Sequence, residues 1–245
     1  MTPLGEAVPA ATRITSGRYV VYHAGRECGE ERWRIEATAE GALATGEHVL
    51  EPPHPFPSRH EWRARLTRAG RLEGLEILWS VGERRLRAVH AADGGRWRAR
   101  IEYGGRVHEQ EGDYPAGCEV DFLSPLFLTF MLARRDFALE GEHEFPVLHI
   151  GPPWMAVTPA RMLIRCVEIG RHAGARGVTE ARRYVVGPPR PAGGAGDEAE
   201  AYTLWADESG LVLETHQGIG SPAPWMKLVE IVNPPRSGWT EGESS

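Results

Sequence analysis

Apolar and polar side chains alternate along much of the first half of the chain. In residues 96–103, Trp97, Ala99, Ile101 and Tyr103 alternate with charged residues. Because successive side chains of a strand point to opposite faces of a sheet, this pattern predicts a strand with one buried face. The same alternation assigns further residues to inward positions: Trp33, Ile35, Ala37, Trp62, Ala64, Leu66, Leu75, Ile77, Trp79, Val81, Leu86 and Ala88.

Glycine-rich turns separate these strands. The segments 68–71, 81–83, 92–95 and 103–105 each supply glycine where the backbone needs a positive φ. Strands joined by such turns at regular spacing predict an antiparallel meander, and a meander that curls avoids long exposed edges. We therefore predict a mostly β fold, in which a curved antiparallel sheet forms an unclosed (half) or closed β-barrel.

The pattern changes at residues 120–135, which are apolar almost all round. Either Asp121 or Ser124 can cap a helix start, Pro125 suits the first turn, and Arg134 and Arg135 suit the C-terminal end. A helix that is apolar on all sides is buried, so we predict one short buried helix over residues 122–133. A membrane-touching or lipid-gating segment is the alternative interpretation.

We expect a single domain. Residues 17–232 form the predicted half-barrel domain, residues 187–198 a flexible loop, and residues 1–16 and 233–245 disordered tails. Period-two patterns predict the later strands at 137–147, 160–169, 178–186, 199–207, 210–217 and 225–232.

The composition of the chain disfavours some classes of function. A net charge of −6 disfavours a nucleic-acid partner, and the three scattered cysteines give no zinc-ligand spacing. We expect no metal and no cofactor. The N-terminus shows no secretory signal and the chain no membrane span, so we expect a cytoplasmic protein without an integral membrane segment. The oligomeric state is left open.

Three segments carry a resemblance to a known family. They are Asp121-Phe-Leu-Ser-Pro-Leu-Phe127, Ala138-Leu-Glu-Gly-Glu142, and Tyr202-Thr-Leu-Trp-Ala-Asp207 followed by Gly210-Leu-Val-Leu213. They resemble an uncharacterised bacterial half-barrel domain family that is similar to the lipoprotein-localisation carriers. The resemblance covers residues 17–232, where it lies in the order of the elements. It implies an unclosed antiparallel half-barrel whose concave face holds acyl chains under a helix.

Aromatic residues are the first candidate site. Large rings on the inward phase either fill the barrel or line a ligand cavity. The predicted ligand-binding residues are Trp33, Trp62, Trp79, Trp97, Tyr103, Phe127 and Trp205.

Catalytic candidates are few, because no recognised catalytic motif is present. His23 and His90 share the inward phase of their strands, where a histidine is either a core residue or a general acid/base. Asp121 is either a helix cap or a catalytic carboxylate. On the outward phase, a basic stripe that Glu61 and Glu102 interrupt consists of Arg63, Arg65, Arg96, Arg98 and Arg100. We expect this stripe to be ion-paired; contact with an anionic lipid or polymer is its alternative.

The sequence leaves open whether the chain is an enzyme. The first hypothesis is binding of an apolar, lipid-like small molecule in the concave interior. The second is a cofactor-independent isomerase, cyclase or hydratase acting on an apolar metabolite. The third is a structural or partner-binding protein with a fully packed interior.

Overall fold

A computed structural model of the protein describes residues 14–187, 201–218 and 224–234. Within these ranges the chain forms strands and one short helix, α1 (Pro125–Leu132). The strands are β1 (Ile14–His23), β2 (Arg26–Thr38), β3 (Gly41–Leu50), β4 (Ser58–Thr67), β5 (Leu72–Val81), β6 (Arg84–Asp93), β7 (Arg96–Tyr103), β8 (Arg106–Asp113), β9 (Glu119–Asp121), β10 (Glu142–Gly151), β11 (Ala156–Gly174), β12 (Gly177–Val186), β13 (Tyr202–Asp207), β14 (Val212–His216) and β15 (Met226–Val232).

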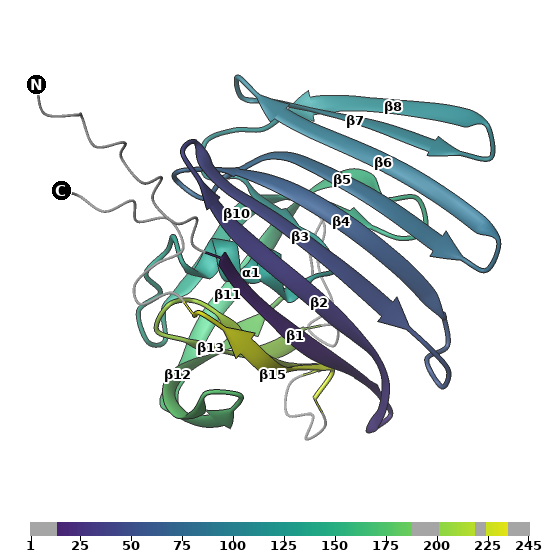
Figure 1. The fold of residues 1–245 in the computed structure, drawn as a ribbon. Coiled ribbons are helices and arrows are strands. Elements are labelled where there is room, and N and C mark those ends of the chain that lie inside the picture. Colours follow the sequence, from purple (N-terminus) through teal and green to yellow (C-terminus); the bar gives the residue numbers. More distant parts are fainter. Residues whose placement is uncertain (1–13, 188–200, 219–223, 235–245) are drawn as a thin grey trace, which may run out of the picture.

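The described strands form one sheet in the order β8-β7-β6-β5-β4-β3-β2-β1-β15-β14-β13-β12-β11-β10-β9 (Figure 1). The first strand pairs with the last, with Ser16 opposite Val232. We call β1–β8 the first arm and β9–β15 the second arm. Neighbours are antiparallel except β9 and β10, which pair in parallel with Val120 opposite Leu148. This exception to the predicted antiparallel pairing arises because α1 forms the crossover that parallel neighbours require.

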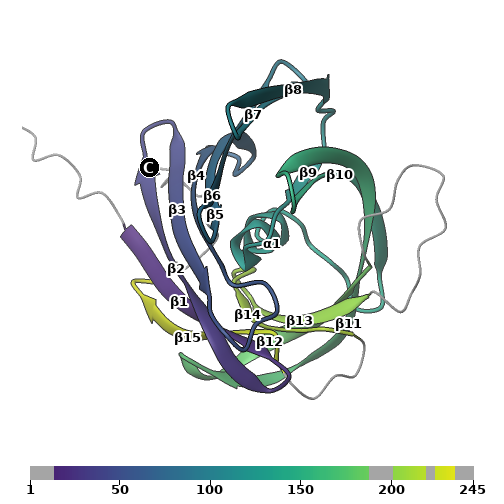
Figure 2. The same ribbon diagram turned by 90° about the vertical axis from the view of Figure 1, so that its right-hand side faces the viewer.

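The sheet curls around α1 without closing (Figure 2). β8 and β9 are its edges, and no backbone ladder joins them in the described part of the chain. Single contacts cross the gap instead: the Val157 N–H donates to Oε1 of Gln110 at 3.0 Å, and the rings of Tyr103 and Trp154 lie 5.2 Å apart. The predicted fold class is confirmed in its unclosed form.

Bulges and tight turns produce the curl. The pairing register shifts between Arg65 and Leu66 in the first arm and between Cys166 and Glu168 in the second. Bulges increase local twist and bend a strand. Gly94 and Gly95 both have positive φ, at 55° and 80°, as a two-residue hairpin turn of the mirror-image type requires. The predicted turn at residues 92–95 is therefore confirmed.

The predicted helix is present but shorter than 122–133. The helix cap is Ser124, whose hydroxyl accepts from the Leu126 N–H at 3.2 Å, and Pro125 follows it. The helix starts at Pro125 because Ser124 caps it, while residues 119–121 belong to β9. Asp121 is therefore a strand residue and not the helix cap.

All eight residues of α1 are buried. Phe127 and Phe130 pack with the first arm, where the Phe127 ring lies 5.5 Å from that of Trp62. Leu128 and Met131 pack with the second arm. Burying each such side chain contributes about 2 kcal/mol, so the helix joins both arms into one core.

Several inward tryptophans lie flat against glycines of a neighbouring strand. Trp62 is opposite Gly46, and a Cβ at Gly46 would overlap the Trp62 indole. Trp97 lies in the same way over Gly112, where a Cβ would come within 2.8 Å of its Nε1. These indoles pack directly on the sheet and belong to the core.

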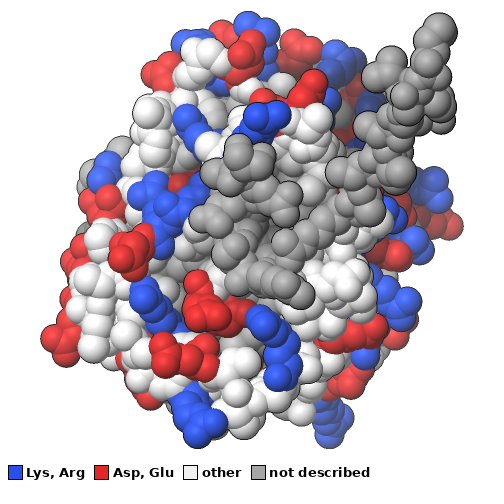
Figure 3. Space-filling view, turned by 60° about the vertical axis from the view of Figure 1, so that its left-hand side comes forward, with Lys and Arg blue, Asp and Glu red and all other residues white. Residues whose placement is uncertain are grey.

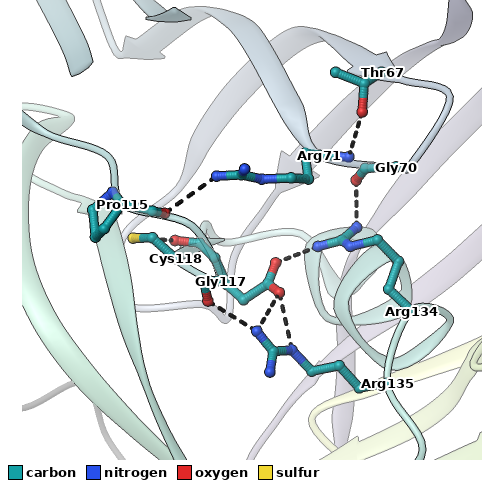
Figure 4. Close-up of polar contacts among 9 residues, drawn as sticks. Thr67, Gly70, Arg71, Pro115, Gly117, Cys118, Arg134 and Arg135 are labelled. Carbon is teal, nitrogen blue, oxygen red and sulfur yellow. Dashed lines mark hydrogen bonds and ion pairs between the residues drawn. The ribbon is translucent and has the colours of Figure 1, made fainter. Parts of the chain in front are cut away.

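Two arginines hold the C-terminal end of α1 (Figure 4). Arg134 forms an ion pair with Glu119 and donates to the Gly70 carbonyl. Arg135 donates to Oε1 of Glu119 from Nε at 3.0 Å and from Nη2 at 2.9 Å. Its Nη2 also donates to the Gly117 carbonyl at 2.9 Å. The helix end is thus fixed to β9, to the loop before it and to the β4–β5 turn.

Charges on the outer surface are mixed. Acidic and basic side chains interleave over the face in Figure 3. On the first arm, Arg96 pairs with Glu111 and Asp113, and Arg100 pairs with Glu102 and Glu109. The predicted ion pairing is thus found at these two positions, whereas no ion pair within the described residues involves Arg63, Arg65 or Arg98.

Residues 14–16 belong to β1 and not to a tail. The remainder of the predicted tail 1–16, the loop 187–198 apart from Gly187, and the tail 233–245 apart from residues 233–234 lie outside the described residues.

Candidate functional site: a cavity between the arms

A cavity of about 630 Å³ lies between the two arms. It is found at the end of the sheet where β3 joins β4, β5 joins β6 and β10 joins β11. Its apolar walls include Val21, Leu50, Trp79, Leu86, Leu123 and Trp225. We call it the interarm cavity. Its size and mainly apolar lining are typical of sites for small molecules.

A row of directly opposed residues crosses the first arm beside this cavity. The strand registers place Glu31 opposite His48, His48 opposite His60, and His60 opposite Trp79. Opposed residues on one face of a sheet interact directly. The His48 and His60 rings are 5.1 Å apart, and the His60 ring stacks on Trp79 at 5.9 Å. The row therefore gives the apolar cavity one polar wall.

Glu31 anchors this polar wall to the helix. Its side chain is fully buried, Oε1 accepts from the Ser124 hydroxyl, and Oε2 lies 3.4 Å from Nδ1 of His48. Ser124 also caps α1. Oε1 thus has a hydrogen-bond partner, as a buried carboxylate needs, whereas Oε2 has none among the described residues. The contacts place His48 close to the start of the helix.

The two histidines are buried, with His48 6% exposed and His60 4% exposed. Burial, and to a smaller extent the nearby His48, lower the pKa of His60 to about 3, against the opposite effect of a hydrogen bond with the His48 backbone. His60 is consequently a neutral imidazole near pH 7.

Two ring nitrogens of the polar wall lack hydrogen-bond partners among the described residues. They are Nε2 of His48 and Nδ1 of His60. An unpartnered buried polar atom costs about 1–3 kcal/mol. Both residues line the interarm cavity, although these two nitrogens themselves have less than 1 Å² of accessible surface.

Exposed aromatic rings flank the mouth of the cavity. Phe56, on the β3–β4 loop, is 73% exposed, and Trp154, on the β10–β11 turn, is 52% exposed. Arg84 and Arg85 at the start of β6 also line this end. Trp154 contacts Tyr103 of the first arm, so one side of the mouth is formed by a contact between the arms.

The structure divides the predicted ligand-binding residues into three groups. Trp79 and Tyr103 line the interarm cavity. Trp33, Trp62, Trp97 and Phe127 are buried in the packed core. Trp205 lies on the second arm with its ring 5.6 Å from that of His172. Their role in ligand binding stays a prediction.

The predicted catalytic candidates do not converge. The His23 ring, at the end of β1, lies 5.6 Å from that of His54. His90 is buried beside a separate small space that Trp97 and Tyr114 also line, and burial lowers its pKa to about 4. Asp121 pairs with Nδ1 of His149 at 2.6 Å, and this contact raises the pKa of His149. A catalytic role for any of the three stays a prediction.

The sequence reasoning missed Glu31, His48 and His60. A signal was present, because Glu31 shares the inward phase of Trp33 and His60 shares that of Trp62. Polar residues on an inward phase point into the interior. The alternation does not reveal the pairing register of the strands, which places these residues in one row.

The described residues contain no convergent group of three or more His, Cys, Asp or Glu side chains suited to a metal ion. Their helix is not long and apolar enough to cross a membrane.

Comparisons with known proteins add information on the fold. No protein-family model matches the chain, and no curated protein matches it significantly. A β-barrel-like protein of the domain of unknown function DUF1849 from Brucella abortus aligns with 89% of this chain and 96% of its own, at 8% identity and a TM-score of 0.55. A DUF1089 family protein from Pseudomonas aeruginosa aligns with 78% of this chain and 91% of its own, at 19% identity and a TM-score of 0.48.

The DUF1849 similarity supports a β-barrel-like fold of the kind found in an uncharacterised bacterial domain family. At this level of identity it shows the fold alone. The similarity to lipoprotein-localisation carriers stays a prediction from the sequence.

Proposed function

We propose that the protein binds an apolar, lipid-like small molecule in the interarm cavity. The observation that carries this proposal is the cavity itself, about 630 Å³ in volume and lined mainly by apolar side chains. It lies beside a helix whose residues are all buried. A fully packed interior, which a purely structural role would favour, is not what the described residues form.

Burial of apolar surface supplies the driving force for such binding, at about 25 cal/mol per Å². Part of this gain offsets the lost freedom of the ligand. Most of the cavity wall comes from strands of the sheet, whose pairing holds it in place before a ligand arrives. A preformed site keeps the ordering cost low.

Ligand binding can be tested without knowing the natural ligand. Native mass spectrometry of protein purified from cells, followed by organic extraction, should reveal a co-purifying apolar molecule. Nile red, a neutral apolar dye, should bind with increased fluorescence. Failure of both measurements would overturn the proposal.

A matched pair of variants locates the bound dye. Ser58 lines the interarm cavity at the start of β4, so Ser58→Trp should fill part of it and weaken Nile red binding about tenfold or more. Ser80, on β5, lines a different groove that contains Arg59 and Arg106. Ser80→Trp should leave binding unchanged. Equal effects of the two substitutions would contradict the assignment.

The Glu31–His48 contact favours a second candidate, a cofactor-independent isomerase, cyclase or hydratase on an apolar metabolite. A histidine positioned by a carboxylate is the arrangement that a general base uses. His48 Nδ1 is 3.4 Å from Glu31 Oε2, and its Nε2 has no partner within the described structure.

The second candidate makes a separate prediction. Incubation of the extracted ligand with the protein in D₂O should introduce deuterium or change the ligand's structure, as read by mass spectrometry. His48→Leu should abolish the change while His90→Leu, at a buried histidine outside the cavity lining, preserves it. A ligand recovered unaltered from wild-type protein would leave binding as the function.

A further inference from the structure

The mouth of the interarm cavity carries exposed aromatic and basic side chains, and from this we infer that it docks on the surface of an anionic lipid bilayer. The docking residues are Phe56, Arg84, Arg85 and Trp154, all of which line the cavity. We call them the mouth face. The inference goes beyond the proposed function, because it names the surface on which the cavity opens and does not depend on the identity of the ligand.

Two aromatic rings of the mouth face are exposed to an unusual extent. Phe56 is 73% exposed and Trp154 is 52% exposed. They are the only exposed Phe or Trp residues in the described part of the chain, and they come from loops of different arms. Exposed apolar groups that gather at one place mark interaction surfaces. Aromatic rings with one wet side are common at the boundary between water and lipid.

Ordered loops hold both rings outward. In the β3–β4 loop, the Phe56 N–H donates to Nδ1 of His54 at 3.1 Å, and prolines on either side of Phe56 restrict the backbone. In the β10–β11 turn, the Met155 N–H donates to the Gly151 carbonyl at 2.9 Å. The Met155 side chain is buried, so Trp154 precedes an anchored residue. Neither ring has to leave the core before it meets a bilayer.

The charged residues that line the cavity are both basic. Arg84 and Arg85 are exposed at the start of β6, and no Asp or Glu of the described residues lines the cavity. Neither arginine forms an ion pair within the described residues, although Glu83 precedes them, whereas the nearby Arg59 and Arg87 are both paired. Anionic lipid surfaces attract basic residues that lie close to them. The free guanidinium groups therefore complement such a surface.

The mouth face lies at one end of the sheet, where the β3–β4, β5–β6 and β10–β11 connections meet around the cavity (Figure 1). The whole chain carries a net charge of −6, so an anionic surface repels the molecule as a whole and attracts this basic end. Docking by this end places the two rings at the depth of the lipid headgroups. An apolar molecule can then pass between the bilayer and the cavity without crossing water.

Vesicle flotation tests the docking directly. Wild-type protein should bind vesicles of equal parts phosphatidylglycerol and phosphatidylcholine about tenfold or more tightly than vesicles of phosphatidylcholine alone. Equal binding to the two vesicles, or no binding to either, would overturn the inference. Nile red binding in the absence of vesicles tests the proposed function separately, so the two can fail independently.

A fluorescent label locates the surface that contacts the vesicle. The three natural cysteines are buried, so Phe56→Cys and Val178→Cys each introduce one accessible thiol. Nitrobenzoxadiazole attached at position 56 should brighten severalfold when anionic vesicles are added. The same label at position 178 should not respond, because Val178 is exposed beside the β11–β12 turn, at the end of β11 away from the mouth. Equal responses at the two positions would contradict docking through the mouth.

Charge reversal provides a matched pair of double variants. Arg84→Glu with Arg85→Glu should weaken binding to the anionic vesicles about tenfold or more. Arg63→Glu with Arg98→Glu makes the same change in net charge at two exposed arginines of the outward stripe, and it should change binding less than about twofold. Equal losses in the two double variants would contradict the assignment of the mouth face.

A second copy of the chain would be a different occupant of the mouth face. In that case the protein would be a dimer in sedimentation experiments, Phe56→Ser would dissociate it, and anionic vesicles would not bind. That result would overturn the inference. A monomer that binds anionic vesicles, and loses this binding severalfold in Phe56→Ser, is the result that we expect.

Discussion

At the scale of single residues, the candidate site depends on one inward position in each of several strands. Glu31, His48, His60 and Trp79 come from β2, β3, β4 and β5, and each faces the next across the sheet. Elsewhere the same geometry pairs Trp62 with Gly46. Residue size and polarity along such rows decide whether the interior is filled or hollow.

The close approach of Trp62 to Gly46 gives the first prediction. Gly46→Ala would place a Cβ within the Trp62 indole, and overpacking of this kind costs about 1–3 kcal/mol. Chemical denaturation should show this loss in the free energy of unfolding. Gly170→Ala is the control, since a Cβ there would meet its nearest atom, Oε1 of Glu168, only at 3.5 Å. Equal losses for the two variants would refute the packing argument.

His60 gives a prediction on pH. Its pKa falls from 6.5 to about 3 in the folded protein, so between these values the unfolded chain binds a proton that the folded protein does not. The free energy of unfolding therefore decreases as pH falls below 6.5, by about 2 kcal/mol for this residue at pH 5.

Urea unfolding at pH 7 and pH 5 measures this contribution. Wild-type protein should lose about 2 kcal/mol more than His60→Leu between the two pH values. If the two proteins lost the same free energy of unfolding between pH 7 and pH 5, His60 would be protonated in the folded protein at pH 5.

At the scale of elements, α1 is held at both ends. Ser124 joins its start to Glu31, and Arg134 and Arg135 join its end to Glu119. These contacts leave the helix in one position between the arms. The floor of the interarm cavity near Leu123 is fixed as a result.

Loss of the Glu119 carboxylate should destabilise the protein. Glu119→Ala leaves two partly buried guanidinium groups without their shared partner, which costs about 3 kcal/mol. Glu144→Ala removes one half of an exposed ion pair with Arg161 and should cost less than about 1 kcal/mol. Thermal unfolding compares the two. If Glu119→Ala lost no more stability than Glu144→Ala, the role of Glu119 in holding the end of α1 would be contradicted.

The elements were more predictable than their arrangement. Alternation is local, so the strands around Trp62 and Trp97 and the apolar helix could be identified from sequence. The three-residue strand β9 and its parallel pairing could not, because they depend on where α1 returns the chain. The polar wall was missed for the same reason, since Glu31, His48 and His60 are neighbours only once the register is known.

At the scale of the whole molecule, the sheet is two arms joined along β1 and β15. The arms meet again through the Gln110–Val157 and Tyr103–Trp154 contacts and not through a ladder. The Tyr103–Trp154 contact lies at the mouth of the interarm cavity.

Trp154 should control the rate of ligand release. Its ring is largely exposed, so Trp154→Ala should change the melting temperature little. It should nevertheless speed Nile red dissociation severalfold in stopped-flow fluorescence, because it removes a contact across the mouth. Leu78→Ala, at an exposed position on β5, is the control and should change neither quantity. An unchanged dissociation rate in Trp154→Ala would refute this role.

The most direct test of the account is a crystal structure of the protein with dodecanol that carries bromine on its terminal carbon. We predict one strong anomalous peak inside the interarm cavity. A bromine peak on the outer surface of the sheet, or an interarm cavity without ligand density when the alcohol is bound elsewhere, would contradict the account.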